Sequence, residues 1–492
     1  MMLPLLFIPP EFYSADTLFF LFVGVLFFMI MGILPALGAP EGLAILLPLI
    51  YRLNTYQVFA LAMGGAAGVY LSGTITSVLL KIPGTTEHVS LTYDGHELAK
   101  QGKAGEALGA AATSALIAGV ASPLLLLLLV PVLREVLLLL GPAEILFVVL
   151  WGLLAATTLA GKSKIKGYFC LFFGLLLSTI GFSLASQVPR FVFGGFYELW
   201  EGIPLVPFFI GILAIPEMLD ALVKGETYIL KGGTVNPFKG LISGIKEPFK
   251  SIRVLLQGTI MGFIIGVIPG IGGATANLVA YAQASTISKR PQKFGEGNID
   301  GVISPQASIA AVWGGALLPT LTFGVPGSET MALILGIFII KGLVPGVPMF
   351  TQHIDIVYFL VWMLILGAIV GTVVVLMLSP LLVKIAKVKT TTWVPIVMGL
   401  IFLGVFALRS TYFDLLLLLL LGLLGYEMKK HDFPRGPFVI AFILGSIIEN
   451  QFSLSWQVYG LSFLYRPSVL LIMALIGITI FYSSYRSYKG RK

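Results

Sequence analysis

Residues 258–272 read Gly258-Thr-Ile-Met-Gly-Phe-Ile-Ile-Gly266-Val-Ile-Pro269-Gly-Ile-Gly272, an apolar run interrupted by a Pro-Gly pair. Proline lacks the backbone donor that a helix needs and clashes with the preceding turn, so a helix breaks there. Irregular backbone inside a membrane persists only where protein covers it or where it lines a wet cavity. The stretch therefore predicts a helix that is broken at membrane depth.

A weaker copy of this pattern lies 234 positions upstream. The matched pairs are Gly24 with Gly258, Gly32 with Gly266, Pro35 with Pro269 and Gly38 with Gly272. Chance does not readily align four helix-breaking residues at one offset. The copy predicts that the chain contains an internal repeat.

A second break follows each copy. It reads Lys81-Ile-Pro83-Gly84-Thr85-Thr86-Glu87 in the first half and Gly324-Val-Pro326-Gly327-Ser328-Glu329-Thr330 in the second. The first and second prolines are 48 residues apart in one half and 57 in the other. We assign the nine extra residues to the polar stretch 285–300. Apolar segments interrupted at matching positions of two halves indicate the substrate site of a transporter.

Composition excludes a soluble protein, because 57% of the 492 residues are hydrophobic and only 11% are charged. The apolar runs predict about ten to twelve transmembrane helices. Their continuous Leu-rich character excludes an outer-membrane barrel. The net charge of +8 comes from Lys and Arg clusters between apolar runs, which indicates membrane topology and not a nucleic-acid partner. Cys170 is the single cysteine, so no intrachain disulfide framework is expected.

Charge clusters predict two membrane repeats of opposite orientation. We assign residues 1–223 to the first repeat, 224–254 to a basic cytoplasmic linker and 255–492 to the second repeat with a cytoplasmic C-terminus. The N-terminus lacks the features of a cleaved signal peptide and is interpreted as a first membrane segment. Residues 41–51 form either a re-entrant hairpin arm or a full crossing, and residues 331–345 are a second short arm. The fold class is all-α, polytopic, with inverted repeats and broken helices or re-entrant hairpins.

These stretches resemble the large membrane subunit of tripartite tricarboxylate transporters, the TctA family. The resemblance covers residues 20–480, with motifs confined to 20–120 and 258–347. The matching motifs are Gly32-Ile-Leu-Pro-Ala-Leu-Gly38, Ile82-Pro-Gly84, Tyr93-Asp-Gly95, Ile268-Pro-Gly-Ile-Gly272, Phe294-Gly-Glu-Gly297, Asp300-Gly-Val302, Gly314-Gly-Ala-Leu-Leu-Pro319, Gly324-Val-Pro-Gly-Ser328 and Gly342-Leu-Val-Pro-Gly346.

The resemblance implies a permease for small carboxylates that a cation gradient drives. It also implies a small four-helix membrane subunit and an extracytoplasmic solute-binding protein as partners. The chain departs from the family where Pro-Glu-Ala-Ala-Asn-Asn-Ala is usual, because it reads Pro305-Gln306-Ala-Ser308-Ile309-Ala310-Ala311. It has Tyr70-Leu71-Ser72-Gly73 where Tyr-Gly-Gly-Ser is usual, and Lys81 in place of an Asn. These departures bear on the substrate, the coupling ion and the partners.

The breaks themselves predict an anion site. Each break frees backbone amides and creates a new helix N-terminus with partial positive charge, which suits a carboxylate. The same breaks are also explained by kinked helices whose glycines pack closely. The predicted substrate-binding residues are glycines and hydroxyl residues at or near the breaks: Gly38, Ser72, Thr74, Thr76, Gly84, Thr85, Thr86, Gly270, Gly272, Thr320, Thr322, Gly327, Ser328 and Thr330.

Several of these residues have a structural alternative. The hydroxyls of Thr74, Thr320 and their neighbours either face a ligand or bond the carbonyl one turn earlier. Glu329 either takes part in proton coupling or stabilises a helix start. Lys81 either attracts a carboxylate or extends toward the membrane interface. Glu217 is interpreted as a solvated helix cap.

The sequence thus predicts a secondary active transporter of the cytoplasmic membrane. Its substrate is a small organic anion such as a di- or tricarboxylate, symported with Na⁺ or H⁺. The histidines lack metal-ligand spacing, no nucleophile–base pattern is present, and no cofactor is expected. The Leu-rich stretches 123–160 and 355–425 are expected to form a scaffold and any homo-oligomer contact. The alternative is a membrane scaffold or assembly protein of the same fold that does not transport.

Overall fold

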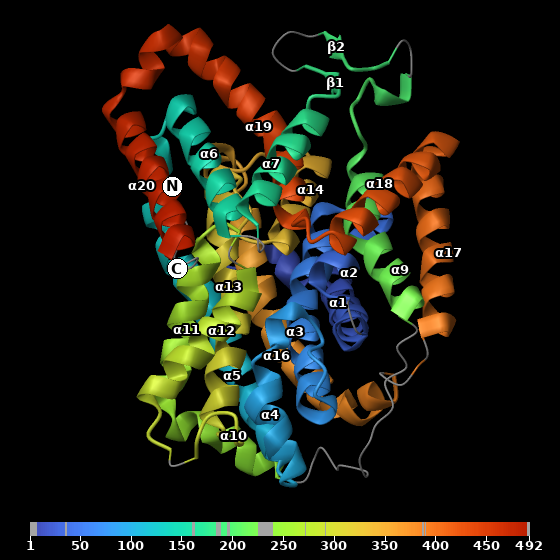
Figure 1. Ribbon diagram of the computed structural model, residues 1–492, viewed down its shortest axis with the longest axis vertical. Coiled ribbons are helices and arrows are strands. Elements are labelled where there is room, and N and C mark those ends of the chain that lie inside the picture. Colours follow the sequence, from blue (N-terminus) through green and yellow to red (C-terminus); the bar gives the residue numbers. More distant parts are fainter. Residues whose placement is uncertain are drawn as a thin grey trace.

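The computed structural model describes residues 7–34, 37–159, 163–183, 188–193, 197–224, 240–270, 272–290, 292–385, 388 and 390–489. The chain is an all-α polytopic membrane protein (Figure 1). Its first-half helices are α1 (Ala15–Ile33), α2 (Ala39–Ile50), α3 (Thr55–Leu80), α4 (Leu91–Lys100), α5 (Ala104–Leu138), α6 (Pro142–Leu159), α7 (Lys164–Ser178), α8 (Leu205–Phe209) and α9 (Ile215–Lys224). A short 3₁₀ turn, η2 (Thr86–His88), follows α3, and a π-helical turn, η4 (Ile210–Ala214), joins α8 to α9.

The second half has a similar order of long and short helices. They are α10 (Leu241–Lys250), α11 (Ile252–Val267), α12 (Gly272–Ile287), α13 (Asp300–Phe323), α14 (Glu329–Ile340), α15 (Val347–Thr351), α16 (Ile354–Ile385), α17 (Thr390–Arg409), α18 (Tyr412–Lys430), α19 (Arg435–Tyr459) and α20 (Pro467–Lys489). Two short strands, β1 (Gly181–Phe182) and β2 (Pro189–Arg190), pair antiparallel with Gly181 opposite Arg190. In Figure 1 this hairpin lies at the opposite end of the molecule from α4 and α10.

Eight helices among the described residues are long and apolar enough to cross a membrane, or nine if α10 and α11, bent by 80°, count as one span. The apolar runs of the sequence predict more transmembrane helices than this, because several of the runs fold as helices too short to meet the length criterion. The helix α2 has 12 residues and rises about 18 Å, too little to cross about 30 Å of hydrocarbon. Residues 41–51 are therefore a short arm and not a full crossing.

The centre of the molecule is built on α3 and α13, which are buried on all sides. Neither helix has a distinct polar face, which is typical of a helix enclosed by others. The helix α1 packs along α3, and α11 packs along α13. Each of the long helices α5 and α16 packs against the central helix of the other half of the chain. The helix α5 lies against α13, and α16 lies against α3.

The repeated glycines in α1 and α11 make equivalent contacts. A Cβ at Gly24 would overlap the Leu61 carbonyl of α3, and one at Gly258 would overlap the Ser304 carbonyl of α13. The two partner residues are 243 positions apart, which is the offset of 234 plus the nine inserted residues. The insertion therefore lies between Gly272 and Ser304, a range that includes the predicted stretch 285–300. These glycines allow two helix backbones to approach closely.

The helices are broken at the predicted prolines that the structure describes. Pro83, Pro269 and Pro326 all lie in non-helical backbone, between α3 and η2, between α11 and α12, and between α13 and α14. The chain also leaves the helix between α1 and α2, but Pro35 itself lies outside the described residues. Residues 225–239 of the predicted linker also lie outside them, and the described remainder of the linker is mainly α10.

Candidate functional site

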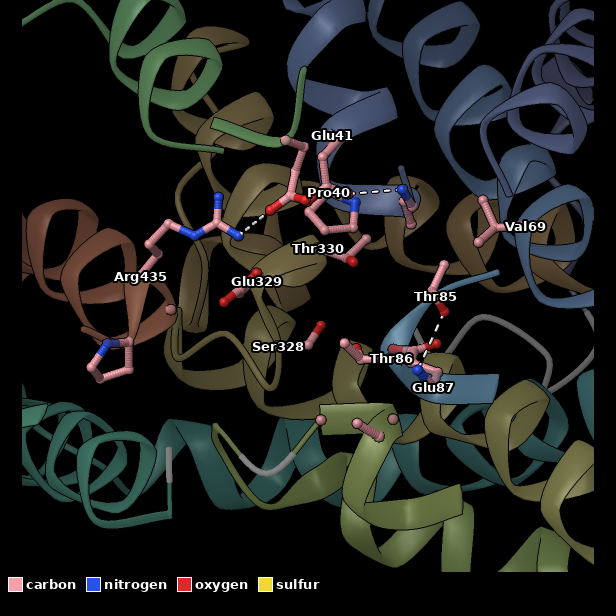
Figure 2. A pocket seen from close by; sticks show the side chains of 18 of the residues that line it. Pro40, Glu41, Val69, Thr85, Thr86, Glu87, Ser328, Glu329, Thr330 and Arg435 are labelled. Atoms are coloured by element: carbon pink, nitrogen blue, oxygen red, sulfur yellow. Dashed lines mark hydrogen bonds and ion pairs between the residues drawn. The ribbon is translucent and has the colours of Figure 1, made fainter. Parts of the chain in front are cut away.

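The breaks surround one cavity of about 650 Å³. Its lining includes Gly38 after α1, Gly84 after α3, Gly270 after α11 and Ser328 after α13, so all four breaks contribute. Figure 2 shows Thr85, Glu87, Ser328 and Thr330 around the same space, although they come from opposite halves of the sequence. The start of α19, near Arg435, completes the lining.

Four helices begin at this cavity. They are α2, α12, α14 and α19, which have 12, 16, 12 and 25 residues. The first turn of a helix has backbone N–H groups without a partner in the helix, and it carries partial positive charge. Four such ends directed at one space favour an anion there.

The backbone of the second-half breaks is held by a direct contact. Gly270 N donates a hydrogen bond of 3.1 Å to the Gly327 carbonyl, which links the break after α11 to the break after α13. Gly270 has φ +77°, a conformation that glycine adopts without strain. A Cβ at Gly327 would come within 2.7 Å of the Gly266 carbonyl. In the first half a Cβ at Gly84 would come within 2.5 Å of the Gly32 carbonyl, so the two halves repeat this contact.

The cavity is rich in ionisable side chains. Among the described residues that line it, four are carboxylates and two are cations, which leaves two negative charges in excess. They are Glu41, Glu87, Glu217, Glu329, Lys429 and Arg435.

Glu217 holds both cations. Its Oε1 accepts a bond of 2.6 Å from Arg435 Nη2, and its Oε2 accepts one of 2.7 Å from Lys429 Nζ. Lys429 also donates to Asp220 at 2.6 Å. This cluster joins α9, α18 and the start of α19. Glu217 is 6% exposed, so its interpretation as a solvated cap is wrong.

A π-helical turn orients Arg435. Its Nη1 donates to the carbonyls of Ile212 and Leu213, at 3.2 and 3.4 Å, in η4. A π-helical turn interrupts the regular ladder of helix hydrogen bonds and is frequent at functional sites. Here its carbonyls hold a guanidinium at the edge of the cavity.

The other acidic residues lie at helix starts. Glu41 Oε2 accepts a bond of 2.8 Å from Gly38 N at the beginning of α2. Glu87 lies against α12, because a Cβ at Gly273 would come within 2.5 Å of its carboxyl carbon. Glu329 is the first residue of α14. Each carboxylate thus lies at one of the four helix N-termini or beside it.

Eight of the fourteen predicted substrate-binding residues line the cavity, and the predicted coupling residue Glu329 lies among them. The eight are Gly38, Gly84, Thr85, Thr86, Gly270, Gly272, Ser328 and Thr330. Two of these hydroxyls also cap short helices: Ser328 Oγ accepts from Met331 N at 3.2 Å, and Thr85 Oγ1 accepts from Glu87 N at 3.3 Å.

The other six predicted residues are outside the lining: Ser72, Thr74, Thr76, Thr320, Thr322 and Gly327. The hydroxyls bond carbonyls of their own helix, three or four residues earlier: Ser72 to Val69, Thr74 to Tyr70, Thr76 to Gly73, Thr320 to Ala316 and Thr322 to Leu318. They lie inside the buried helices α3 and α13, where such bonds satisfy the polar group. Gly327 lies directly behind the lining, at its contact with Gly266.

The sequence motifs do not indicate Glu41, Glu87, Lys429 or Arg435 as site residues. Lys429 and Arg435 belong to a basic cluster that follows an apolar run, a pattern that predicts membrane topology. The signal that was available is Pro434-Arg435-Gly436-Pro437, a fifth Pro/Gly-rich break that has no counterpart in the internal repeat.

Comparison with models of protein families shows the family of this chain. The model of the family described as "Tripartite tricarboxylate transporter TctA family" matches residues 18–440. The chain belongs to the TctA family. It is therefore a multi-pass transport protein, a component of a tripartite tricarboxylate transporter, as the sequence motifs predict.

Two curated proteins from Agrobacterium vitis are similar to this chain. One is an uncharacterised 52.8 kDa protein in the TAR-I ttuC' 3' region, 30% identical over 431 residues, which cover 87% of this chain and 85% of the relative. The other is an uncharacterised protein in the TAR-II ttuC' 3' region, 29% identical over 190 residues, or 39% of this chain and 78% of the relative. No solved structure matches the chain.

Proposed function

We propose that this TctA protein is the permease that carries a small organic anion, a di- or tricarboxylate, across the cytoplasmic membrane. The observation that carries the proposal is the convergence of α2, α12, α14 and α19 by their N-termini on one cavity. Helix N-termini bind carboxylates through free N–H groups and the helix dipole. A cavity of about 650 Å³ lies in the range of small-molecule sites and leaves room for an anion with water or ions.

We further propose that a cation accompanies the anion. The lining residues have a formal excess of two negative charges. Unbalanced charge costs more free energy where little water is present, so a cation that neutralises this excess stabilises the site. A substrate of charge −2 or −3 adds to that excess. Protons on carboxylates such as Glu329, or Na⁺ at free carbonyls and hydroxyls of the breaks, would compensate it.

The proposed partners are a small four-helix membrane subunit and an extracytoplasmic solute-binding protein, as the tripartite family suggests. The proposed orientation has two inverted repeats and a cytoplasmic C-terminus, which Arg486, Lys489, Arg491 and Lys492 support by the positive-inside rule. Lys429 and Arg435 support that orientation less than their position after an apolar run suggests. Both form ion pairs with Glu217 in the cavity lining.

The family departures do not favour a scaffold that has lost transport. Gln306, Ile309 and Ala310 stand where a carboxylate and two amides are usual, but all three lie within buried α13 and outside the lining. Gln306 Nε2 donates to the Tyr70 carbonyl at 3.1 Å, and its Oε1 accepts from Thr74 at 2.6 Å. The departures therefore change the contact between α3 and α13 and leave the cavity lining intact.

Proteoliposomes test the proposal. The full chain, with the membrane subunit and binding protein supplied, is offered labelled citrate, tartrate, malate and succinate. Gradients of Na⁺ and of pH are imposed separately. We expect one or more anions to accumulate only with a gradient, and Gly399→Ala, which meets no atom within 4 Å, to behave like the wild type. Folded protein that accumulates none of the anions under either gradient contradicts the proposal.

A further inference from the structure

The carboxylate of Glu41 occupies a position that the sequence assigns to substrate. Glu41 lies in the first turn of α2, is 7% exposed and lines the cavity. Its Oε2 accepts a bond of 2.8 Å from the backbone N–H of Gly38 (Figure 2). Gly38 is one of the residues whose amide is predicted to bind an anion. The chain thus fills its own anion site with an internal carboxylate.

Glu41 and Gly38 form the capping box of α2, in which the side chain of the third helical residue accepts from the backbone N–H of the cap residue. In α14 the neutral hydroxyl of Ser328 caps the helix by accepting from Met331 N at 3.2 Å. In the second repeat the residue equivalent to Glu41, 234 positions later, is Thr275. A capping box does not require a charge, because α3 begins with one in which the third helical residue is the neutral Gln57. Burying a carboxylate costs more than burying a hydroxyl unless its charge is compensated.

The charges around Glu41 compensate it only in part. They are Glu217 of α9, Glu329 of α14 and Arg435 of α19. Arg435 is already paired with Glu217 at 2.6 Å. The other helices packed on α2, namely α1, α3, α8 and α17, contribute no charged group to the described lining. A substrate carboxylate that approaches Gly38 therefore meets Glu41 and Glu329, and like charges that share one site do not both stay ionised cheaply.

We propose that Glu41 is an internal substitute for the substrate carboxylate and the residue that couples a proton to anion binding. The arriving carboxylate takes over the Gly38 N–H. The released Glu41 carboxylate binds a proton from the aqueous phase and becomes a neutral carboxylic acid, and the substrate stays ionised. One proton is then bound with each anion. This inference rests on the proposed function and assigns the coupling proton to Glu41 in preference to Glu329.

Calorimetry tests this step on the full chain in lipid nanodiscs. Citrate, tartrate, malate and succinate are titrated in buffers of different ionisation enthalpy, which gives the number of protons bound with each anion. At pH values where Glu41 is ionised in the anion-free wild type, we expect uptake of about one proton and an affinity that weakens about tenfold per pH unit. Glu41→Gln can still accept from Gly38 N–H, so it should fold, bind without proton uptake and lose the pH dependence. Glu41→Asp should retain both. Glu329→Gln should still take up about one proton, although loss of this lining carboxylate changes the affinity itself.

The outcomes separate two failures. A wild type that binds none of the four anions contradicts the proposed function. A wild type that binds an anion, together with a Glu41→Gln variant that still takes up a proton, overturns the role of Glu41. Infrared difference spectroscopy gives an independent measurement if Glu41→Gln does not fold. Anion binding should produce a protonated-carboxyl band in the wild type that shifts in Glu41→Asp, and an absent or unshifted band rejects the inference.

Discussion

Single glycines set how closely the helix breaks approach their neighbours. Gly270 and Gly272 both have positive φ, +77° and +68°, but their surroundings differ. A Cβ at Gly270 would overlap Ala156 of α6, whereas one at Gly272 meets nothing within 4 Å. Backbone conformation alone therefore requires glycine at position 272. At position 270 both the conformation and the packing against Ala156 require it.

Alanine variants should separate the two requirements. Gly272→Ala should lower stability by about 1–2 kcal/mol, the cost of a left-handed conformation for an L-residue. Gly270→Ala should cost more, because Ala156 must also move. Gly399→Ala, in helix α17 with open space around it, should match or slightly exceed the wild type. Thermal unfolding in detergent gives the order, and equal midpoints for Gly270→Ala and Gly272→Ala would exclude the packing argument.

At the scale of elements, the loop between α12 and α13 is held to α4 by one carboxylate. Asp94 is fully buried on α4. Its Oδ1 accepts from the backbone N–H of Gly295, Gly297 and Asn298, at 2.9, 2.9 and 2.7 Å, and its Oδ2 accepts from Tyr281 Oη at 2.8 Å. This explains why Tyr93-Asp-Gly95 and Phe294-Gly-Glu-Gly297 occur together as motifs.

Removing the charge of Asp94 should loosen this loop. Asp94→Asn is expected to cost about 1.5–3 kcal/mol, the range for hydrogen bonds to a charged group, and to expose residues 288–299 to protease. Tyr281→Phe removes only one of the four bonds and should cost about 1 kcal/mol. Chemical denaturation and limited proteolysis of the two variants measure the difference. If Asp94→Asn is no less stable than Tyr281→Phe, the charge of Asp94 does not hold the loop.

Charge pairing also joins elements, through Glu217 between α9 and α19. A double-mutant cycle with Glu217→Gln and Arg435→Gln should give a coupling energy of about 0.5–3 kcal/mol that salt changes little, because the pair is largely buried. The control is the exposed pair Lys100–Glu97 on α4, where about 0.3–0.5 kcal/mol is expected and salt should reduce it. Equal coupling in the two cycles would show that the cavity cluster does not tie these helices together.

For the whole molecule, the sequence predicts those parts of the architecture that glycine and proline determine. The offset of 234 residues and the later insertion both reappear in the contacts of Gly24 with Leu61 and of Gly258 with Ser304. Covalent constraints of this kind act locally, so a single chain reveals them. The gathering of the breaks around one cavity follows from the repeat.

The sequence is less informative where a side chain's role depends on distant partners. Thr74 and Thr320 stand near breaks, but the Thr320 hydroxyl bonds the previous turn of its own helix, and the Thr74 hydroxyl bonds its own helix and Gln306. Arg435 resembles a topology marker, and its place in the site depends on Glu217 and the π-helical turn, more than 200 residues away. Pairings across the tertiary structure leave no periodic signal in one sequence.

Accessibility from water tests the arrangement of the whole molecule. Cys170 is buried, and Cys170→Ser gives a background for single introduced cysteines. Thr86→Cys lines the cavity and should react with a water-soluble maleimide, whereas Thr320→Cys, buried in α13 with 0% exposure, should not. A transported anion should slow the reaction at residue 86 because it fills the same space. If Thr320→Cys reacts as fast as Thr86→Cys in folded protein, water reaches the interior of α13 and the breaks do not enclose the site.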